Sequence, residues 1–432
     1  MLKRKIINIL NDWKKSSHKE ALLLKGARQI GKTTAVREFA RQNYTHFVEI
    51  NFEQNPEVKE AFAGSRDART IISRLSLMGY GPFVAGKTLV FFDEIQSCPN
   101  ARTAIKFLVE DNQFDYIESG SLLGINYAEV SSYPVGFEFQ VEMFPLDFEE
   151  WLWANGISDE IIQEVKNNFI NGKNIDAVTH EQLMKLYRNF LIVGGMPKVV
   201  TTYLEHIDFA EVIRQQRIII DSYRDDIAKY AASQKTKAKR FFDAIPSQIA
   251  KQRKRYILSD LEKTGNMQKY EDAAQWLADA GIAYFSYNTH TLAMPFEQYE
   301  NRNLFKVYLL DTGLLCSLWG EKLQWEVMKG NIAINEGGLT ENFVAAELVK
   351  HGHQLHYYDR KSRNELDFLI RENNLVSIIE VKSGNDYKKH SALNNVMDEF
   401  SEFIERSIVL SKFNIDNSET IQYSPIYTSM WL

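Results

Sequence analysis

The feature that most constrains this chain is a glycine-rich turn that interrupts an apolar run near the N-terminus. Residues 21–34 read ALLLKGARQIGKTT, and residues 26–33 match the pattern G-x-x-x-x-G-K-[ST] at every fixed position. A short buried strand over 21–24 is expected to enter the turn, and a helix is expected to begin near Lys32. This part of the chain is therefore expected to fold as strand, tight turn and helix.

Such a turn is suited to the phosphates of ATP. The two glycines let backbone N–H groups surround a polyphosphate, and the helix N-terminus adds unpaired amides and the positive end of its dipole. Lys32 is predicted to contact the β and γ phosphates, and the Thr33 hydroxyl is predicted to bind Mg²⁺. A purely structural glycine turn is the alternative. The predicted nucleotide-binding residues of the turn are Gly26, Ala27, Arg28, Gln29, Ile30, Gly31, Lys32, Thr33 and Thr34.

A second stretch, TLVFFDEI at residues 88–95, is an apolar strand that ends in two carboxylates. Two carboxylates at the end of a buried strand are unfavourable for the fold unless a cation pairs with them. Asp93 is predicted to hold Mg²⁺ through a water molecule, and Glu94 to orient and deprotonate the attacking water. Lys32 and Glu94 are thus the predicted catalytic residues of this site, and Glu94 distinguishes a hydrolase from a protein that only binds nucleotide.

Strands and helices alternate around these motifs. Further strands are expected at 46–52 and 116–119, and helices at 56–78 and 101–112, which predicts a parallel sheet covered on both faces. Ligands bind at the carboxyl ends of such strands. Ser119 and Ser121 lie at one of these ends, so either is predicted to sense the γ-phosphate through a hydrogen bond. Capping of a turn is the alternative for each serine.

The overall composition excludes several classes of protein. At 432 residues the chain is expected to form two to four domains. A net charge of −6 argues against a chain that is coated in nucleic acid, although a local basic patch is compatible with it. Two cysteines, Cys98 and Cys316, exclude a disulfide framework and fit a reducing cytoplasm. No window approaches 18 apolar residues, so no membrane contact is expected.

The middle of the chain changes character. Residues 148–230 are expected to be helical throughout, with a sharp helix stop at GGMP, residues 194–197. Residues 233–270 carry ten basic and three acidic side chains, a net charge of +7. Helices followed by a β-ribbon favour a winged-helix-like domain there, and such a domain can bind DNA. A solvated basic surface or a packing module between domains is the alternative.

A second chemical centre is expected near the C-terminus. Residues 365–382 read ELDFLIRENNLVSIIEVK, with strand-like segments on either side of a turn at Asn373 and Asn374. In a hairpin centred on this turn, Asp367 lies opposite Glu380. The two side chains would be about 5 Å apart, and their charges would repel by about 3 kcal/mol at an effective dielectric constant near 20.

A divalent cation would remove this repulsion, and Lys382 would add a positive charge on the same face. Asp, Glu and Lys around Mg²⁺ are the groups that phosphodiester hydrolysis needs. Asp367, Glu380 and Lys382 are therefore predicted catalytic residues, and Asp367 and Glu380 predicted metal ligands. A salt-bridged surface is the alternative. Glu341, in the helical pattern GGLTENFVAAELVKHG, is predicted to be a further metal ligand or a solvated carboxylate.

Several motifs together resemble one family. The order GARQIGKTT, LVFFDEI, SGS, FPLDFEEWL, GGMP, FKVYLLDTGLL and ELDFLI…IIEVKSG is similar to AAA-superfamily P-loop ATPases of bacteria and archaea. These proteins carry a C-terminal domain of unknown function that resembles the PD-(D/E)xK restriction-endonuclease-like fold. Relatives place a basic residue after the glycine that precedes the PLSFxE-like segment, whereas Gly136 is followed by Phe137. The resemblance therefore assigns no arginine finger.

The resemblance implies an α/β protein with a P-loop NTPase parallel sheet and three further parts. The expected domains are a P-loop ATPase core (1–147), a helical lid (148–232), a winged-helix-like domain (233–325) and a nuclease-like domain (326–432). The expected function is ATP binding and hydrolysis, with a nucleotide cycle that controls a Mg²⁺-dependent nuclease-like domain acting on DNA. The alternative is an ATP-dependent switch that binds DNA or a protein partner without nuclease activity.

Overall fold

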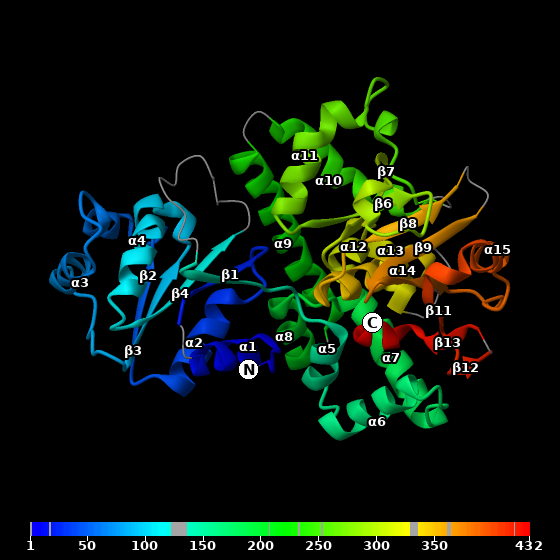
Figure 1. The fold of residues 1–432 in the computed structure, drawn as a ribbon, viewed down its shortest axis with the longest axis horizontal. Coiled ribbons are helices and arrows are strands. Elements are labelled where there is room, and N and C mark those ends of the chain that lie inside the picture. The colour runs from blue at the N-terminus through cyan, green and yellow to red at the C-terminus, as the bar shows by residue number, and fades with distance from the viewer. Residues whose placement is uncertain are drawn as a thin grey trace. The chain divides into compact units, whose positions relative to one another are not determined.

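The computed structural model describes residues 2–16, 19–121, 136–206, 208–231, 234–251, 254–328, 336–360, 364–418 and 420–432 (Figure 1). The chain forms two compact units. The N-terminal unit is Lys3–Phe144 with Asp279–Gly281, and the C-terminal unit is built mainly from Pro145–Ala278 and Ile282–Leu432.

The N-terminal unit contains the predicted parallel sheet. The five strands that the described residues form are ordered β2-β3-β4-β1-β5, and every neighbouring pair is parallel. All carboxyl ends therefore lie at one edge, where the predicted site residues also fall. The strands are β1 (Ala21–Gly26), β2 (His46–Asn51), β3 (Thr88–Asp93), β4 (Asp115–Ser121) and β5 (Glu138–Glu142).

Helices cover both faces of this sheet because the strands are apolar on both sides. One face buries Leu23, Val90 and Phe92 in a core shared with a 3₁₀ helix at Pro56–Phe62 and with α3 and α4. On the other face α2 packs against β1 to β4, while α1 packs on α2. The helices of this unit are α1 (Ile6–Lys15), α2 (Lys32–Asn43), α3 (Ala68–Leu77) and α4 (Pro99–Glu110).

One predicted helix is divided in the structure. The stretch expected to be helical from residue 56 to residue 78 forms the 3₁₀ helix and then α3. Between them Ala63 is extended and Gly64 has φ +69°. Asp67 then starts α3 by accepting a hydrogen bond from the Thr70 N–H, so a new N-cap replaces helix continuation.

The described residues between 148 and 230 of the C-terminal unit form a succession of helices joined by short turns, as predicted. The GGMP stop separates α7 from α8, where Gly194 has φ +74°. A Cβ on Gly194 would lie 2.2 Å from Asp311 Oδ1. The helices of this unit are α5 (Phe148–Ala154), α6 (Asp159–Ile170), α7 (Ala177–Val193), α8 (Pro197–His206), α9 (Phe209–Tyr230), α10 (Lys235–Ile249), α11 (Met267–Asp279), α12 (Thr312–Leu318), α13 (Glu321–Met328), α14 (Glu336–Lys350) and α15 (Ser391–Phe400).

Within the part of the C-terminal unit that the structure describes, the strands form one eight-stranded mixed sheet in the order β12-β13-β11-β10-β9-β8-β6-β7. Helix α14 packs on it against β6, β7 and β10. The strands are β6 (Ala283–Thr289), β7 (Glu300–Leu309), β8 (His356–Asp359), β9 (Glu365–Glu372), β10 (Leu375–Lys382), β11 (Ile404–Ser411), β12 (Asp416–Asn417) and β13 (Gln422–Pro425).

This sheet crosses the expected domain boundary at residue 326. The β6–β7 ribbon, assigned by sequence to a winged-helix-like domain, pairs through β6 with β8 of the segment expected to be nuclease-like. The backbone groups of β6 that do not bond to β7 form hydrogen bonds with β8, in the register that sets Tyr287 opposite His356. The structure therefore joins the two expected domains through one sheet.

Within the described part of the chain, no helix is both long enough and apolar enough to cross a lipid bilayer.

Candidate functional site

The glycine turn between β1 and α2 has the backbone that its sequence predicts. Gly26 has φ +151° and Gly31 has φ +93°, conformations that favour glycine. A Cβ on Gly26 would lie 2.2 Å from the Met143 carbonyl oxygen. The Lys32 ammonium folds over the turn and donates to the carbonyls of Gly26 at 2.9 Å and Ala27 at 2.8 Å. The lysine is thus held at the mouth of the turn.

Asp93 lies beside the turn, at the carboxyl end of β3. The Thr33 hydroxyl lies 3.2 Å and 3.3 Å from the two Asp93 carboxylate oxygens. Alternate residues of a strand face opposite sides of the sheet, and Asp93 shares its side with α2, where Thr33 is the second residue of the first turn. The structure therefore brings Asp93 to Lys32 and Thr33, although Asp93 lies 60 residues after Thr33 in the sequence.

Two other strand ends hold the Asp93 carboxylate. Asn51, the last residue of β2 and the register partner of Asp93, donates from Nδ2 to Asp93 Oδ2 at 3.0 Å. Ser119 of β4 donates its hydroxyl to Asp93 Oδ1. Ser119 was predicted to sense phosphate, and in the structure it bonds to Asp93. Asn51 was not identified from sequence, although its position at the end of a predicted strand was a usable signal.

Glu94 follows Asp93 in a left-handed conformation, with φ +56°. Its carboxylate accepts a hydrogen bond from the Gln96 side-chain amide. Burial raises the pKa of Glu94, while Gln96 and Lys32 oppose the rise. Burial also lowers the pKa of Lys32 to about 8, although Glu94 and Asp93 act in the other direction. Burial thus shifts both groups toward their uncharged forms.

The other predicted nucleotide-binding residues lie in the same turn or in the first turn of α2. Gln29 has φ +64°, and Arg28 lies 3.6 Å from Glu53. The backbone of Ser121 ends β4, but its side chain lies outside the described residues. The residues of this group are Ala27, Arg28, Gln29, Ile30 and Thr34.

These residues fit a nucleotide with Mg²⁺. A hydroxyl and a carboxylate side by side are hard oxygen ligands of the kind Mg²⁺ takes. Gly31 caps α2 without a side-chain hydrogen bond, so the amides of the first helical turn face the phosphate position. Thr33 and Asp93 would hold the ion, and Lys32 and the turn would hold the phosphates.

A buried ion group lies on the opposite side of the sheet from Asp93. Arg102 of α4 contacts Glu118 of β4 at 3.0 Å and Glu138 of β5 at 2.8 Å, and all three side chains are almost fully buried. Burial raises the pKa of Glu118 to about 8, against the lowering effect of Arg102. Sequence reasoning missed this group because its members are separated in the chain and none belongs to a motif.

The hairpin of the C-terminal unit has the predicted register. β9 and β10 are antiparallel, with Phe368 opposite Ile379, and Asn373 at the turn has φ +56°, which asparagine tolerates. One residue further along this register, Asp367 faces Glu380, and the Asp367 N–H donates to Glu380 Oε2 at 3.3 Å. The predicted neighbours are therefore adjacent.

Lys382 joins this pair as predicted. Its ammonium donates to Glu380 Oε1 at 2.5 Å, while the Val381 N–H donates to Asp367 Oδ2 at 2.9 Å. Burial, with a contribution from Asp367, raises the pKa of Glu380 to about 7. Burial and the nearby Glu341 also raise the pKa of Asp367.

Glu341 reaches the same place from α14 and meets cations that the sequence did not assign to the site. Lys254 forms an ion pair with Glu341 Oε2, and Lys306 Nζ lies 3.3 Å from Oε1. The Tyr308 hydroxyl also donates to Oε1. Burial alone would raise the pKa of Glu341, but the two ammonium groups lower it to about 2. The signal for Lys306 was a lysine inside the apolar strand LFKVYLL.

The four acidic side chains Glu341, Glu365, Asp367 and Glu380 form what we call the carboxylate cluster. Within the described ranges, no group of three or more His, Cys, Asp or Glu side chains is placed to hold a metal ion. Mg²⁺ requires about six oxygens at about 2.1 Å, whereas the oxygens here already accept from lysine ammonium groups, from backbone N–H groups or from the Tyr308 hydroxyl. As they lie in this structure, the predicted ligands Glu341, Asp367 and Glu380 do not fit a metal ion.

Fewer side chains of the basic stretch 233–270 are available to contact nucleic acid than its net charge suggests. Lys254 pairs with the carboxylate cluster, and Arg253 lies outside the described residues. Three other members pair with Asp260 or Glu262 of the same stretch, namely Arg240, Lys251 and Lys269. Lys235, Lys239 and Lys263 are exposed and remain candidates for contact with nucleic acid.

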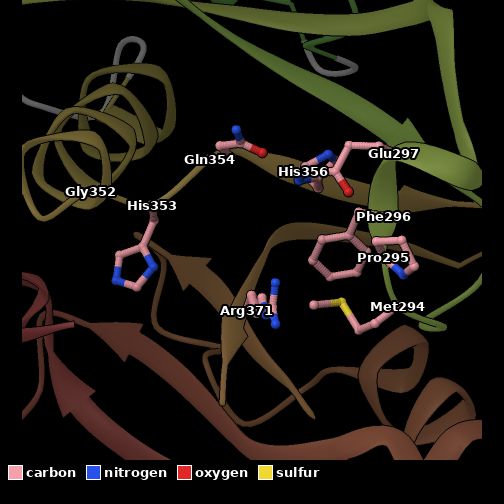
Figure 2. Close-up of a pocket in the computed structure, with 9 residues that line it drawn as sticks. All are labelled: Met294, Pro295, Phe296, Glu297, Gly352, His353, Gln354, His356 and Arg371. Atoms are coloured by element: carbon pink, nitrogen blue, oxygen red, sulfur yellow. The ribbon is translucent and has the colours of Figure 1, made fainter. Parts of the chain in front are cut away.

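A cavity of about 370 Å³ in the C-terminal unit contains none of the predicted residues. Figure 2 shows the residues that line it, which come from the loop after β6, the segment after α14, the start of β8 and β9. The ring of His356 packs 4.7 Å from that of Phe296, and His356 Nε2 lies 3.3 Å from Glu300 Oε2. The lining residues are Met294, Pro295, Phe296, Glu297, Gly352, His353, Gln354, His356 and Arg371.

Three regions of the chain match family models. Residues 18–152 match an AAA domain, residues 184–325 a domain of unknown function (DUF8612), and residues 336–427 a domain of unknown function (DUF4143). The N-terminal region is thus similar to AAA domains of the P-loop ATPase superfamily, which supports that part of the resemblance. The other two families carry no stated activity, so they do not confirm a nuclease-like domain.

Solved structures give weak similarities. The RuvB Holliday junction branch migration motor of Thermotoga maritima has 13% identity and a TM-score of 0.29, over 65% of this chain and 89% of that chain. ORC1 of Aeropyrum pernix in complex with DNA has 13% identity and a TM-score of 0.24, over 79% and 92%. PCH-2 of C. elegans has 12% identity and a TM-score of 0.27, over 48% and 63%. These TM-scores are too low to support an inference.

No curated protein matches the sequence.

Proposed function

We propose that the N-terminal unit binds ATP with Mg²⁺ and hydrolyses it. The observation that carries the proposal is the convergence of Lys32, Thr33 and Asp93 at one edge of the sheet, with Glu94 next to them. The similarity of residues 18–152 to an AAA domain supports the same reading. Mg²⁺ held by Thr33 and Asp93 would neutralise phosphate charge and polarise the reacting phosphoryl group.

The residues of the chain have distinct roles in this reaction. Lys32 exchanges its two carbonyl partners for phosphate oxygens, and the turn amides hold the remaining phosphates. Glu94 takes a proton from water as the water oxygen bonds to the γ-phosphorus and the bond to the β–γ bridging oxygen breaks. A carboxylate whose pKa is raised by burial is a stronger base, which suits this role. Gln96 orients Glu94 through its hydrogen bond.

Phosphate release from ATP tests the proposal. Glu94→Gln removes the base but keeps the size of the side chain, so the rate is expected to fall by about 10²- to 10⁴-fold with ATP affinity nearly unchanged. Glu110→Gln is the matched control because Glu110 is an exposed carboxylate of the same unit. Equal rates in the wild type and Glu94→Gln would exclude Glu94 as the base.

A coupling role for the C-terminal unit belongs to the same proposal. The nucleotide cycle would control this unit, with DNA contacted through the exposed lysines 235, 239 and 263 of the basic stretch. Phosphate release is expected to rise when DNA is added, and Lys235→Ala with Lys239→Ala is expected to reduce that rise. The rise is also expected to weaken with added salt. Identical rates with and without DNA would contradict the coupling.

A second candidate function is phosphodiester cleavage by the C-terminal unit. The specific observation in its favour is the adjacency of Asp367, Glu380 and Lys382, which the hairpin register produces. Lys382 would stabilise charge that develops on a phosphodiester. The rival function is an ATP-dependent switch that binds DNA or a protein partner and cuts nothing.

Nicking of plasmid DNA separates these two candidates. Cleavage is expected in the wild type with a divalent cation, and in Lys32→Ala without nucleotide. It is expected to be lost in Asp367→Asn and in Lys382→Ala. Asp386→Asn is the matched control, since Asp386 is an exposed carboxylate of the same unit. Absence of cleavage with every divalent cation tried would favour the switch.

A further inference from the structure

The carboxylate cluster contains a buried ammonium group that no motif predicted. Lys306 projects from β7, and its side chain is 1% exposed. Its Nζ lies 2.9 Å from Glu365 Oε1, 3.3 Å from Glu341 Oε1 and 3.6 Å from Asp367 Oδ1. Lysine is almost never fully buried unless its charge is paired. Lys306 is therefore a cation enclosed by three carboxylates.

The charges of the cluster are almost balanced by lysines. Four carboxylates face Lys254, Lys306 and Lys382, so full ionisation leaves a single net negative charge. Glu341 is fully engaged, because one of its oxygens meets Lys254 and the other meets Lys306 and the Tyr308 hydroxyl. A divalent cation would need the same oxygens that now surround Lys306 Nζ. The ion and the ammonium group cannot occupy this place together.

The two lysines on Glu341 are also linked to each other through the backbone. Arg255 forms a β-bridge with Lys306, and the Tyr256 N–H donates to the Phe305 carbonyl at 2.8 Å. β7 is the last strand in the order of the described sheet, so the segment with Lys254 runs along its outer edge. A shift of this segment would move Lys254 relative to Glu341 and would break the bridge to Lys306.

We propose that Lys306 is the resident cation of the carboxylate cluster and that a divalent cation binds there only by displacing it. The proposal deepens the second candidate function, since it names the residue that decides when that site accepts metal. It also explains how Asp367, Glu380 and Lys382 can have the predicted geometry although the carboxylate cluster, as it lies, does not fit a metal ion.

Binding of Mn²⁺, followed by the electron paramagnetic resonance signal of the free ion, tests the proposal without any cleavage. The full chain is used in an Asp93→Asn background, which removes the metal ligand of the N-terminal unit. Lys306→Met keeps an unbranched side chain, one atom shorter than that of lysine, and removes its charge. We expect it to bind Mn²⁺ at least about tenfold more tightly than the parent, because a repelling unit charge is removed from the site. Lys269→Met, an exposed lysine of the same unit, is the matched control and is expected to change nothing.

A second measurement uses the unaltered lysine, in case Lys306→Met does not fold. Acetylation of Lys306 with acetic anhydride, read by mass spectrometry, is expected to rise severalfold when millimolar Mn²⁺ is added. The proposal is overturned if Lys306→Met binds Mn²⁺ no more tightly than its parent, or if acetylation of Lys306 stays constant when millimolar Mn²⁺ is added. Tight Mn²⁺ binding by Lys306→Met without any DNA cleavage would support this inference and reject the nuclease proposal.

Discussion

The buried state of Lys32 predicts that nucleotide affinity depends on pH in a specific direction. Burial lowers the pKa of Lys32 to about 8 in the nucleotide-free protein. ATP binds to the charged ammonium, and the bound phosphates raise the lysine pKa again, so binding takes up a proton above this pH. Affinity must therefore fall as the pH rises through the pKa of the free protein.

The size of the effect follows from the same pKa. A group with a pKa of about 8 is about nine-tenths protonated at about pH 7 and about one-tenth protonated at about pH 9. The dissociation constant for Mg·ATP is thus expected to rise about tenfold over this interval. Titration with a fluorescent ATP analogue at constant ionic strength measures it.

Lys32→Arg provides the control for this experiment. A guanidinium group keeps its charge throughout the interval, so its dissociation constant is expected to stay flat even if it is larger than in the wild type. A wild-type dissociation constant that does not change between about pH 7 and about pH 9 would refute the reasoning. The same rise in Lys32→Arg would also refute it, because another group would then be titrating.

Three further substitutions test the N-terminal unit. Asn51→Ala removes a hydrogen bond from the Asp93 carboxylate. It is expected to weaken the Mg²⁺ dependence of ATP binding by about tenfold and to leave Mg²⁺-free binding unchanged. Titration with ATP in the presence and absence of the metal measures both. Arg102→Met leaves two buried glutamates without their counter-charge and is expected to lower the free energy of unfolding by about 3–5 kcal/mol, measured by urea denaturation. Gly26→Ala is expected to abolish ATP binding, whereas Gly64→Ala, also at positive φ but in open space, is expected to retain it.

The local features of both sites could be predicted from sequence because they depend on neighbouring residues. The order of strand, glycine turn and helix around Lys32 follows from an apolar run, two glycines and a helix-compatible pattern. The register that sets Asp367 opposite Glu380 follows from the position of the turn at Asn373. In both cases the determining signals lie within about twenty residues.

Features that depend on distant pairing could not be predicted in this way. Asn51 joins Asp93 only because β2 and β3 are neighbours in the sheet, and Lys306 joins Glu341 only because the β6–β7 ribbon extends the C-terminal sheet. Periodicity identifies such strands but does not indicate which sheet they enter. For the same reason the sequence places the β6–β7 ribbon and the strands from β8 onward in separate expected domains. As a consequence, Lys254 and Lys306 are not assigned to the carboxylate cluster from sequence.

The central claim is that Lys32, Thr33 and Asp93 form one site for Mg²⁺ and nucleotide. Isothermal titration with ATP in the presence and absence of Mg²⁺ tests it most directly, on the wild type, Lys32→Ala and Asp93→Asn. We expect Mg²⁺ to tighten ATP binding in the wild type, to have no effect in Asp93→Asn, and to leave Lys32→Ala without measurable binding. Equal ATP affinity in all three proteins would contradict the account.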